Sequence, residues 1–146
     1  MKAVIQRVKS ASVTIDGKIY SKISHGLLVL IGITDSDNKK KAEWMANKLA
    51  NLRIFEDEEG RMNLSVTDKS GSILIVPNFT LYGDAKKGFR PSFGHAAPAN
   101  ISEPLYDYMI DYMMNNFSLK IAAGRFGAMM EVGLINDGPV TIILEK

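Results

Sequence analysis

The sequence contains no cysteine among its 146 residues. Disulfide scaffolds, zinc sites with cysteine ligands and thiol nucleophiles are therefore excluded. Its only two histidines, His25 and His95, provide too few imidazoles for a typical zinc site, so we expect no metal centre. No apolar run approaches the roughly 20 residues that a membrane-spanning helix needs. Polar residues follow Met1 too soon for a secretory signal peptide, and we expect a cytoplasmic protein.

The chain has little net charge, because 18 Lys and Arg residues face 16 Asp and Glu residues. A net charge of +2 does not by itself indicate a nucleic-acid-binding protein. Basic residues gather at positions 39–41 and at Lys86, Lys87 and Arg90, and acidic residues gather at positions 56–59. Solvated surfaces are the ordinary interpretation of such runs. The length predicts one domain, spanning residues 1–146.

Hydrophobic patterning predicts several strands and two helices. The expected strands or extended segments, some preceded by turn signals such as Asp16-Gly17, are 2–15, 18–23, 26–34, 52–55, 62–64, 72–81, 129–135 and 140–144. The run 26–34 is apolar throughout, which is typical of a strand buried on both faces. One helix is expected over 38–51, capped by Asp35 or Asp37. A second is expected to open with Ser102 as its cap and to continue to Phe117.

Two helices among seven or eight strand segments, mostly joined by short turns, predict an α+β domain. We expect a largely antiparallel, curled and barrel-like sheet with the two helices packed on it. The βαβ rhythm and the glycine fingerprint of a dinucleotide-binding fold are absent from the sequence.

Standard catalytic motifs are also absent, including the P-loop, the nucleophile elbow and the zinc-protease helix. The segment 82–100 is expected to be a loop, and loops this long often carry function. It contains His95, which could act as an acid or base, although a lone loop histidine is more often without a catalytic role.

Pro77 interrupts an otherwise apolar strand and is followed by Asn78, Phe79 and Thr80. Proline cannot donate a hydrogen bond to a neighbouring strand, so it marks an edge, a bulge or a strand end. Unpaired backbone N–H groups at such a break could hold a carbonyl oxygen, as an oxyanion site does. The simpler alternative is an edge strand with a β-favouring threonine.

A second unusual segment, residues 136–141, reads Asn-Asp-Gly-Pro-Val-Thr between two apolar strands. Such residues are typical of a tight hairpin turn. The Gly138–Pro139 bond is one that can be cis, which would orient the Gly138 carbonyl unusually.

Together these segments resemble the D-aminoacyl-tRNA deacylases, the D-tyrosyl-tRNA deacylase family. The matching blocks cover nearly the whole chain: residues 4–8, 11–14, 26–30, 57–64, 79–82, 90–93, 124–128 and 136–141. Several co-linear blocks of this length are far more specific than any one short motif.

The resemblance implies an enzyme that hydrolyses the ester joining a D-amino acid to tRNA and that also removes glycine from mischarged tRNA. It implies a homodimer with active sites at the subunit interface, no metal or organic cofactor, and the acceptor end of aminoacylated tRNA as partner. One family motif falls on Pro77, Asn78, Phe79 and Thr80.

The second family motif falls on Gly138 and Pro139, which the resemblance implies to be a Gly-cis-Pro that enters the partner's pocket. Its carbonyl groups would leave no room for the side chain of an L-amino acid, and Arg7 matches the arginine that braces it. A rigid wall suits this task, because both enantiomers offer the same groups to attractive contacts.

The resemblance assigns catalysis to Asn78, Phe79 and Thr80, with the oxyanion held by backbone N–H groups near Phe79 and Thr80. It assigns substrate binding to a second set: Gly138, Pro139, Pro77, Arg7, Phe89 and Met130. Thr80 is either the nucleophile or a positioning group. We favour positioning, because no base is evident beside it; the substrate's ribose 2′-hydroxyl would then help to activate water.

The chain departs from the family pattern at three positions. Pro77 replaces a serine, Asn78 replaces a glutamine, and Met129 stands where many members carry aspartate. A related animal group with proline at the first of these positions tolerates small L-amino acids. Two alternatives therefore stay open: a relaxed deacylase acting on glycine or small L-amino acids, and a catalytically weak tRNA-binding protein that uses Lys86, Lys87 and Arg90 on phosphates.

Overall fold

The computed structural model describes residues 1–146 and contains eight strands, two α-helices and one short 3-10 helix. The strands are β1 (Lys2–Ile15), β2 (Lys18–Ile23), β3 (Gly26–Gly32), β4 (Phe55–Glu56), β5 (Met62–Leu64), β6 (Ser72–Pro77), β7 (Lys120–Ala123) and β8 (Glu131–Glu145). The helices are α1 (Lys39–Asn51), the 3-10 helix η1 (Phe79–Tyr82) and α2 (Ala99–Asn116). Neither α-helix combines the length and apolar character required to cross a membrane.

The main sheet has the strand order β2-β1-β3-β6-β7, and β8 pairs with β1 outside this path. β1 runs antiparallel to β2, β3 and β8, whereas β3–β6 and β6–β7 are parallel pairs. Parallel neighbours require a crossover, and α1 and α2 provide the two that are needed. The sheet is therefore mixed, and the carboxyl ends of β3 and β6 lie together at one edge.

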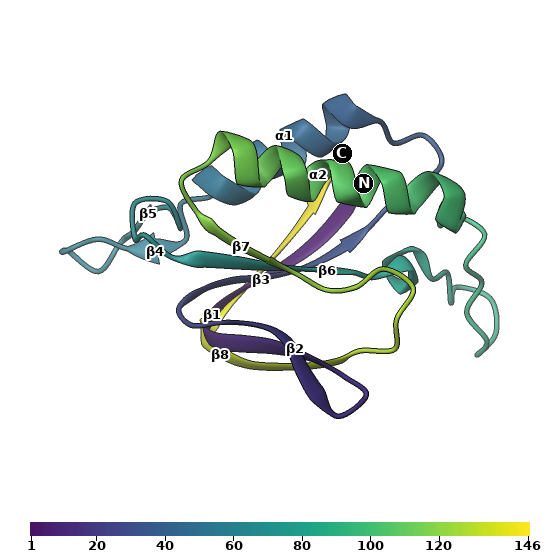
Figure 1. Ribbon diagram of the computed structural model, residues 1–146, viewed down its shortest axis with the longest axis horizontal. Coiled ribbons are helices and arrows are strands. Elements are labelled where there is room, and N and C mark those ends of the chain that lie inside the picture. Colours follow the sequence, from purple (N-terminus) through teal and green to yellow (C-terminus); the bar gives the residue numbers. More distant parts are fainter.

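Both helices cover one face of the sheet, and β2 curls back toward β6 and β7 on the other side (Figure 1). The expected α+β fold, with a barrel-like sheet and two packed helices, is confirmed. Two apolar clusters result, one beneath the helices and one inside the curled sheet. β3 contributes Leu27 to the first cluster and Leu28 to the second, so it is buried on both faces as expected.

β6 is shorter than the sequence predicts, because it ends at Pro77 and not at Leu81. Pro77 has no N–H, and its Cδ faces Gly124, so backbone pairing on the β7 side cannot continue past this residue. The N–H of Asn78 donates to the carbonyl of Ile31 at 2.8 Å, and the chain then leaves the sheet. η1 begins at Phe79 in place of the expected strand, with Asn78 as its N-cap.

Both α-helices begin at residues other than those the sequence predicts. α1 is capped by Asn38, whose side chain accepts from the Lys41 N–H at 3.2 Å, so neither expected aspartate is the cap. α2 begins at Ala99, one turn before the expected start, and Ser102 lies within its first turn. The Ser102 hydroxyl donates to the carbonyl of Pro98 at 3.0 Å, and a serine engaged with the preceding turn is not a cap.

The expected hairpin at residues 136–139 is also wrong, because β8 runs through it as one strand. Gly138–Pro139 is a cis peptide bond within that strand. β1 is long enough to pair with both halves of β8, and the pairing register shifts on either side of Val8. The Asn136 amide donates to the carbonyls of Arg7 and Val140 at 2.9 and 3.2 Å, which binds this irregular stretch to β1 without a turn.

The amino terminus is part of the core. The Met1 ammonium group donates to Asp37 Oδ1 at 2.6 Å and to the carbonyl of Lys146 at 2.8 Å. Asp37 also contacts Lys41 Nζ at 3.1 Å and accepts from the Thr34 N–H at 2.9 Å, and its side chain is fully buried. This carboxylate therefore joins β1 and the carboxyl end of the chain to the start of α1.

Replacing Asp37 by asparagine should destabilise the protein strongly, because it leaves the buried ammonium group without a counter-charge. We expect the free energy of unfolding to fall by about 3 kcal/mol, as for other buried ion pairs that lose one partner. Urea unfolding followed by circular dichroism measures this. Asp35→Asn is the matched control, since Asp35 is exposed and should change stability by less than about 0.5 kcal/mol. Equal midpoints for the two variants would contradict the account.

Candidate functional site

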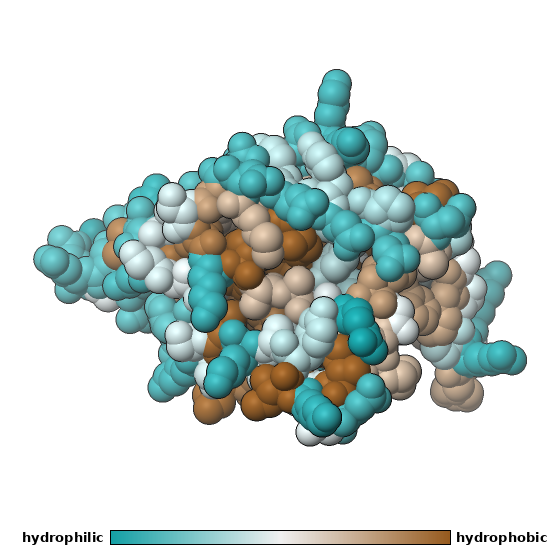
Figure 2. Space-filling model, in the orientation of Figure 1, coloured by the Kyte–Doolittle hydropathy of each residue, from teal (hydrophilic) through white to brown (hydrophobic).

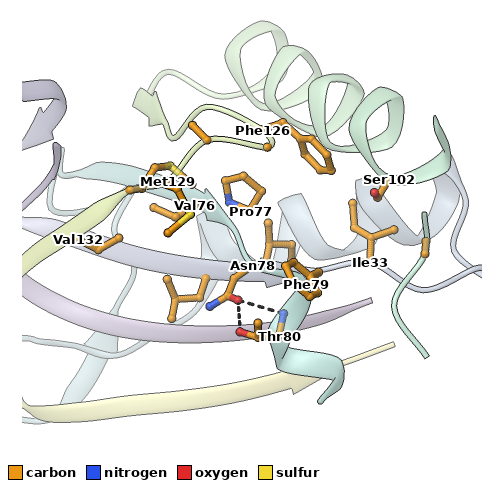
Figure 3. A pocket seen from close by; sticks show the side chains of 16 residues that line it. Ile33, Val76, Pro77, Asn78, Phe79, Thr80, Ser102, Phe126, Met129 and Val132 are labelled. Atoms are coloured by element: carbon orange, nitrogen blue, oxygen red, sulfur yellow. Dashed lines mark hydrogen bonds between the residues drawn. The ribbon is translucent and has the colours of Figure 1, made fainter. Parts of the chain in front are cut away.

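A cavity of about 500 Å³ opens where β3 and β6 end. Its walls come from the carboxyl ends of these strands, from η1, from the first turns of α2 and from the segment 126–132 (Figure 3). Eleven of the sixteen lining residues are hydrophobic, so the cavity suits a ligand with a large apolar or aromatic part.

The structure brings together part of the predicted site. Five predicted residues line the cavity: Pro77, Asn78, Phe79, Thr80 and Met130. The first four are consecutive because the chain turns from β6 into η1 at this point. Met130 comes from the segment that follows β7, and only the curl of the sheet places it here.

Sequence reasoning missed other lining residues, among them Phe126 and Ser102. Phe126 lies in the Gly124–Ala128 block that carried the family resemblance, so that block held the signal. Ser102 gave no such signal, because its position fitted a helix cap equally well. In Figure 3, Phe126 lies above Pro77, and Ser102 lies at the right, near Ile33.

Asn78 fixes the position of Thr80. Its Oδ1 accepts from the Thr80 N–H at 3.1 Å and from the Thr80 hydroxyl, as the dashed lines in Figure 3 show. A short side chain that bonds to the backbone two residues ahead is typical of asparagine in turns. The Thr80 N–H is therefore occupied, while the lone pairs of its hydroxyl oxygen can accept a hydrogen bond from a ligand.

The backbone N–H of Phe79 has no hydrogen-bond acceptor within the chain, since it is the first residue of η1. Of the two backbone donors expected from the sequence, only this one is free. The Phe79 ring is 59% exposed and meets Phe93 edge to face, with ring centroids 5.3 Å apart. A free donor beside a held hydroxyl is an arrangement that can bind a carbonyl oxygen.

No ionisable side chain lines the cavity. Thr80 therefore has no general base beside it, and its hydroxyl faces only an amide oxygen. No group of three or more His, Asp or Glu residues lies close enough together to hold a metal ion. The chain's own contribution to chemistry here is limited to hydrogen bonds, shape and the exclusion of water.

Tyr106 of α2 holds two walls of the cavity together. Its buried hydroxyl lies 3.0 Å from the carbonyl of Ile75 in β6 and 3.0 Å from that of Gly124 after β7. Burial raises the pKa of Tyr106 well above its usual range, so the hydroxyl stays protonated and donates. A Cβ at Gly124 would lie 2.9 Å from Met130 Sδ and 3.2 Å from Pro77 Cδ, so a larger residue there would displace the Met130 side chain from the cavity wall.

Gly138 and Pro139 do not line the cavity, although the sequence predicts them as substrate-binding residues. Both are exposed on β8. Arg7 lies beneath them: its Nε is 3.1 Å from the carbonyl oxygen and 3.1 Å from the carboxylate of Asp137. A further bond of 2.7 Å joins its Nη1 to the carbonyl of Ile54, so Arg7 supports this part of β8 from within the fold.

Two loop residues of the sequence analysis also lie outside the cavity. Phe89 is fully exposed in the loop after η1, and His95 is exposed further along the same segment. His95 forms no hydrogen bond or ion pair with another side chain, and the geometry gives it no catalytic partner.

The acidic run at residues 56–59 forms a turn between β4 and β5. Asp57 Oδ1 accepts from the backbone N–H groups of Arg61 and Glu59 at 3.0 and 2.9 Å. These bonds, that of Arg61 first, lower the pKa of Asp57. A carboxylate committed to backbone donors closes a turn, which agrees with a solvated, structural run.

Comparison with known proteins gives one family. The family model described as "D-Tyr-tRNA(Tyr) deacylase" matches residues 4–145. A D-aminoacyl-tRNA deacylase of Brevibacillus brevis is 54% identical over 146 residues, covering all of both chains. That of Thermosipho africanus is 52% identical, covering all of this chain and 97% of the relative.

Two solved structures share the fold. A protein titled "c-Myc DNA Unwinding Element Binding Protein" superposes with a TM-score of 0.94 at 44% identity, covering 100% of this chain and 99% of the other. A second, titled a probable eukaryotic D-amino acid tRNA deacylase, superposes with a TM-score of 0.85 at 16% identity, covering 98% and 97%. The second similarity concerns the fold alone.

Replacing Tyr106 by phenylalanine should loosen the cavity walls, because two buried carbonyl groups lose their only side-chain donor. We expect the free energy of unfolding to fall by about 1–2 kcal/mol, because the carbonyl of Gly124 loses the Tyr106 donor while that of Ile75 keeps the Gly124 N–H at 2.8 Å. Tyr20→Phe, which removes an exposed hydroxyl with no partner, should leave stability unchanged. Thermal unfolding of both variants tests this, and an unchanged Tyr106→Phe midpoint would show that the hydroxyl does not hold the walls.

Proposed function

The chain belongs to the D-Tyr-tRNA(Tyr) deacylase family, and on that premise we propose that it hydrolyses the ester bond of D-aminoacyl-tRNA. The products are free D-amino acid and tRNA. The enzyme is thus a carboxylic ester hydrolase that removes mischarged amino acids, and its place is the cytoplasm, where aminoacyl-tRNA is used.

The observation that carries the proposal is the combination found at the break between β6 and η1. An apolar cavity lies directly beside a free Phe79 N–H and a Thr80 hydroxyl that Asn78 holds in place. The ester carbonyl oxygen would accept from the Phe79 N–H. In the transition state this oxygen becomes an oxyanion, and a fixed donor in a water-poor site stabilises it by several kcal/mol.

The reaction adds a water oxygen to the ester carbon and then breaks the bond to the ribose 3′-oxygen. The proton that water loses ends on that leaving oxygen. Since no ionisable side chain lines the cavity, the neighbouring ribose 2′-hydroxyl of the substrate is the group best placed to pass this proton. Thr80 then positions the substrate and does not act as nucleophile, because an unactivated threonine hydroxyl is a weak one.

Selection against L-amino acids is assigned to Gly138 and Pro139 of a second copy of the chain. Both residues are exposed and lie outside the cavity of their own chain, while Arg7 supports the strand beneath them. Inserted into the partner's cavity, their carbonyl oxygens would occupy the space of an L side chain. Glycine has no side chain to exclude, so glycyl-tRNA should be hydrolysed as well.

The exposed strand β8 supports such a dimer. It pairs only with β1, so its other edge is open, and open edges favour pairing with another chain. Apolar side chains stand exposed along it: Leu134 (38%), Ile135 (58%) and Ile143 (67%). A second copy packed here would bury these side chains together with the Gly138–Pro139 segment.

A relaxed deacylase is the second candidate, and Pro77 favours it. The family serine at this position would supply a hydroxyl and a backbone N–H, and proline has neither. With fewer donors beside the ester, discrimination and rate would both decrease, and small L-amino acids would be accepted. The same assay separates the two candidates.

The test is hydrolysis of D-Tyr-tRNA, L-Tyr-tRNA and Gly-tRNA by the purified protein. We expect rapid loss of the D-tyrosyl and glycyl esters and no loss of the L-tyrosyl ester above the spontaneous rate. Comparable loss of the L-tyrosyl ester, or of the ester of L-Ala-tRNA assayed beside it, would establish the relaxed deacylase. Binding of tRNA without loss of any ester would leave a tRNA-binding protein and would overturn the proposal.

Two Thr80 variants extend this assay. Thr80→Ala should lower kcat for D-Tyr-tRNA about tenfold, the effect of one lost hydrogen bond, and Thr80→Ser should restore most of it. Complete loss of activity in a folded Thr80→Ala variant would instead identify Thr80 as the nucleophile.

Replacing Ile143 by aspartate should dissociate the dimer, because a charge would take the place of an exposed apolar side chain that the second copy buries. Light scattering after gel filtration should give the mass of two chains for the wild type and of one for Ile143→Asp. Ile19→Asp on β2 is the matched control, with a side chain 64% exposed against 67%. A wild type that runs as one chain at micromolar concentration would contradict the dimer.

A further inference from the structure

The loop between η1 and α2 contains a closed segment at residues 84–92, here named the basic loop. Its two ends form an antiparallel bridge, with Asp84 N–H donating to Ser92 O at 2.7 Å and Ser92 N–H to Asp84 O at 2.8 Å. Gly88 has a φ of +72°, which allows the sharp turn at its tip. Because the two ends of the loop are hydrogen-bonded to each other, its tip is held in a defined position.

Three cations lie in the basic loop without acidic partners. Lys86, Lys87 and Arg90 are all exposed, and none takes part in any of the ion pairs of the protein. The carboxylate of Asp84 is the nearest acid in sequence, and it accepts from the backbone N–H of Lys86 at 2.9 Å. Three positive charges are thus available to an anionic partner.

Phe89 lies between these cations and is 106% exposed, the largest exposure of any large apolar side chain in the protein. Its ring contacts no other aromatic ring, whereas the nearby rings of Phe79 and Phe93 pack against each other. A fully solvated phenylalanine side chain buries no apolar surface and therefore does not stabilise the fold. Flanked by cations, it matches the pattern of proteins that bind single-stranded nucleic acids, which stack bases on aromatic rings.

The basic loop is joined directly to the proposed catalytic site. Gly83 N–H donates to the carbonyl of Thr80 at 2.9 Å, so the loop starts where η1 ends. Phe93, just after the loop, packs on Phe79 at the rim of the cavity. In Figure 1 this segment extends from the end of the sheet at the right, and Figure 2 shows hydrophilic side chains projecting there.

We propose that the basic loop binds the unpaired nucleotides that precede the terminal adenosine of tRNA, with one base stacked on Phe89 and Lys86, Lys87 and Arg90 on the phosphates. This inference rests on the proposed function, which places the ester in the cavity. Only an unpaired strand offers the face of a base to a side chain, so the loop selects the single-stranded acceptor end. The loop binds RNA and takes no part in the chemical step.

The test compares two substrates with the same ester: D-Tyr-tRNA and 3′-O-(D-tyrosyl)adenosine, which lacks every preceding nucleotide. Phe89→Ala should raise KM for D-Tyr-tRNA about tenfold with kcat unchanged, as loss of one stacked base does. It should leave both constants for the adenosine ester unchanged. Phe89→Trp should restore the wild-type KM, because indole also stacks.

Charge is tested with the double variant Lys86→Gln/Lys87→Gln. The slope of log KM for D-Tyr-tRNA against log salt should decrease by about 1.4, two released counterions at about 0.7 each. Lys69→Gln/Lys120→Gln is the matched control, because both residues are exposed and lie at the amino ends of β6 and β7, away from the cavity. Its slope should equal that of the wild type.

Two outcomes would overturn the inference. In the first, Phe89→Ala lowers kcat/KM equally for D-Tyr-tRNA and for the adenosine ester. In the second, it changes kcat/KM for neither substrate. Failure of the proposed function is distinguishable, since the wild type would then hydrolyse neither ester. In that case the Kd for uncharged tRNA, measured on the same preparations, still tests the loop. An unchanged Kd in Phe89→Ala would then refute it.

Discussion

The break in β6 at Pro77 is the constraint on which the site depends. Proline has no N–H, and its Cδ faces Gly124, so backbone pairing on the β7 side ends there. On the β3 side the Asn78 N–H, bonded to the carbonyl of Ile31 at 2.8 Å, is the last contact. The chain must turn at once, and Asn78 caps the turn by accepting from Thr80. The start of η1 leaves the Phe79 N–H free at the mouth of an apolar cavity. Removing the break would remove donor and cavity together.

A second feature of the structure is that two parts of the predicted site lie apart within one chain. The cavity and the segment Gly138–Pro139 are two exposed features of one chain that do not meet within it. Each is supported from below, the cavity walls by Tyr106 and the β8 segment by Arg7. In the proposed function, the neutral cavity supplies orientation and a single oxyanion donor, the substrate's own hydroxyl would supply proton transfer, and a second chain would supply chiral exclusion.

The sequence predicts much of this arrangement, because hydrophobic periodicity and turn residues act locally. The approximate positions of most strands and of both helices, the buried strand β3 and the break at Pro77 follow from such local rules, whereas β7 (Lys120–Ala123) was not predicted. Contacts between residues that lie far apart in the sequence and meet across the curled sheet do not follow from local rules. For this reason the sequence does not predict Phe126 and Ser102 as cavity residues. The continuous course of β8 through Asn136 was also missed, since its pairing with distant β1 overrides the local preference for a turn.

The central claim is that the free Phe79 N–H holds the ester carbonyl, and backbone NMR tests it directly. A non-hydrolysable analogue, with an amide replacing the ester of D-tyrosyl-adenosine, is titrated into ¹⁵N-labelled protein. The account predicts that the Phe79 amide proton moves downfield on binding, as a new hydrogen bond requires, and that the L analogue leaves it unchanged. Saturable binding of the D analogue with no shift at Phe79 would contradict the account.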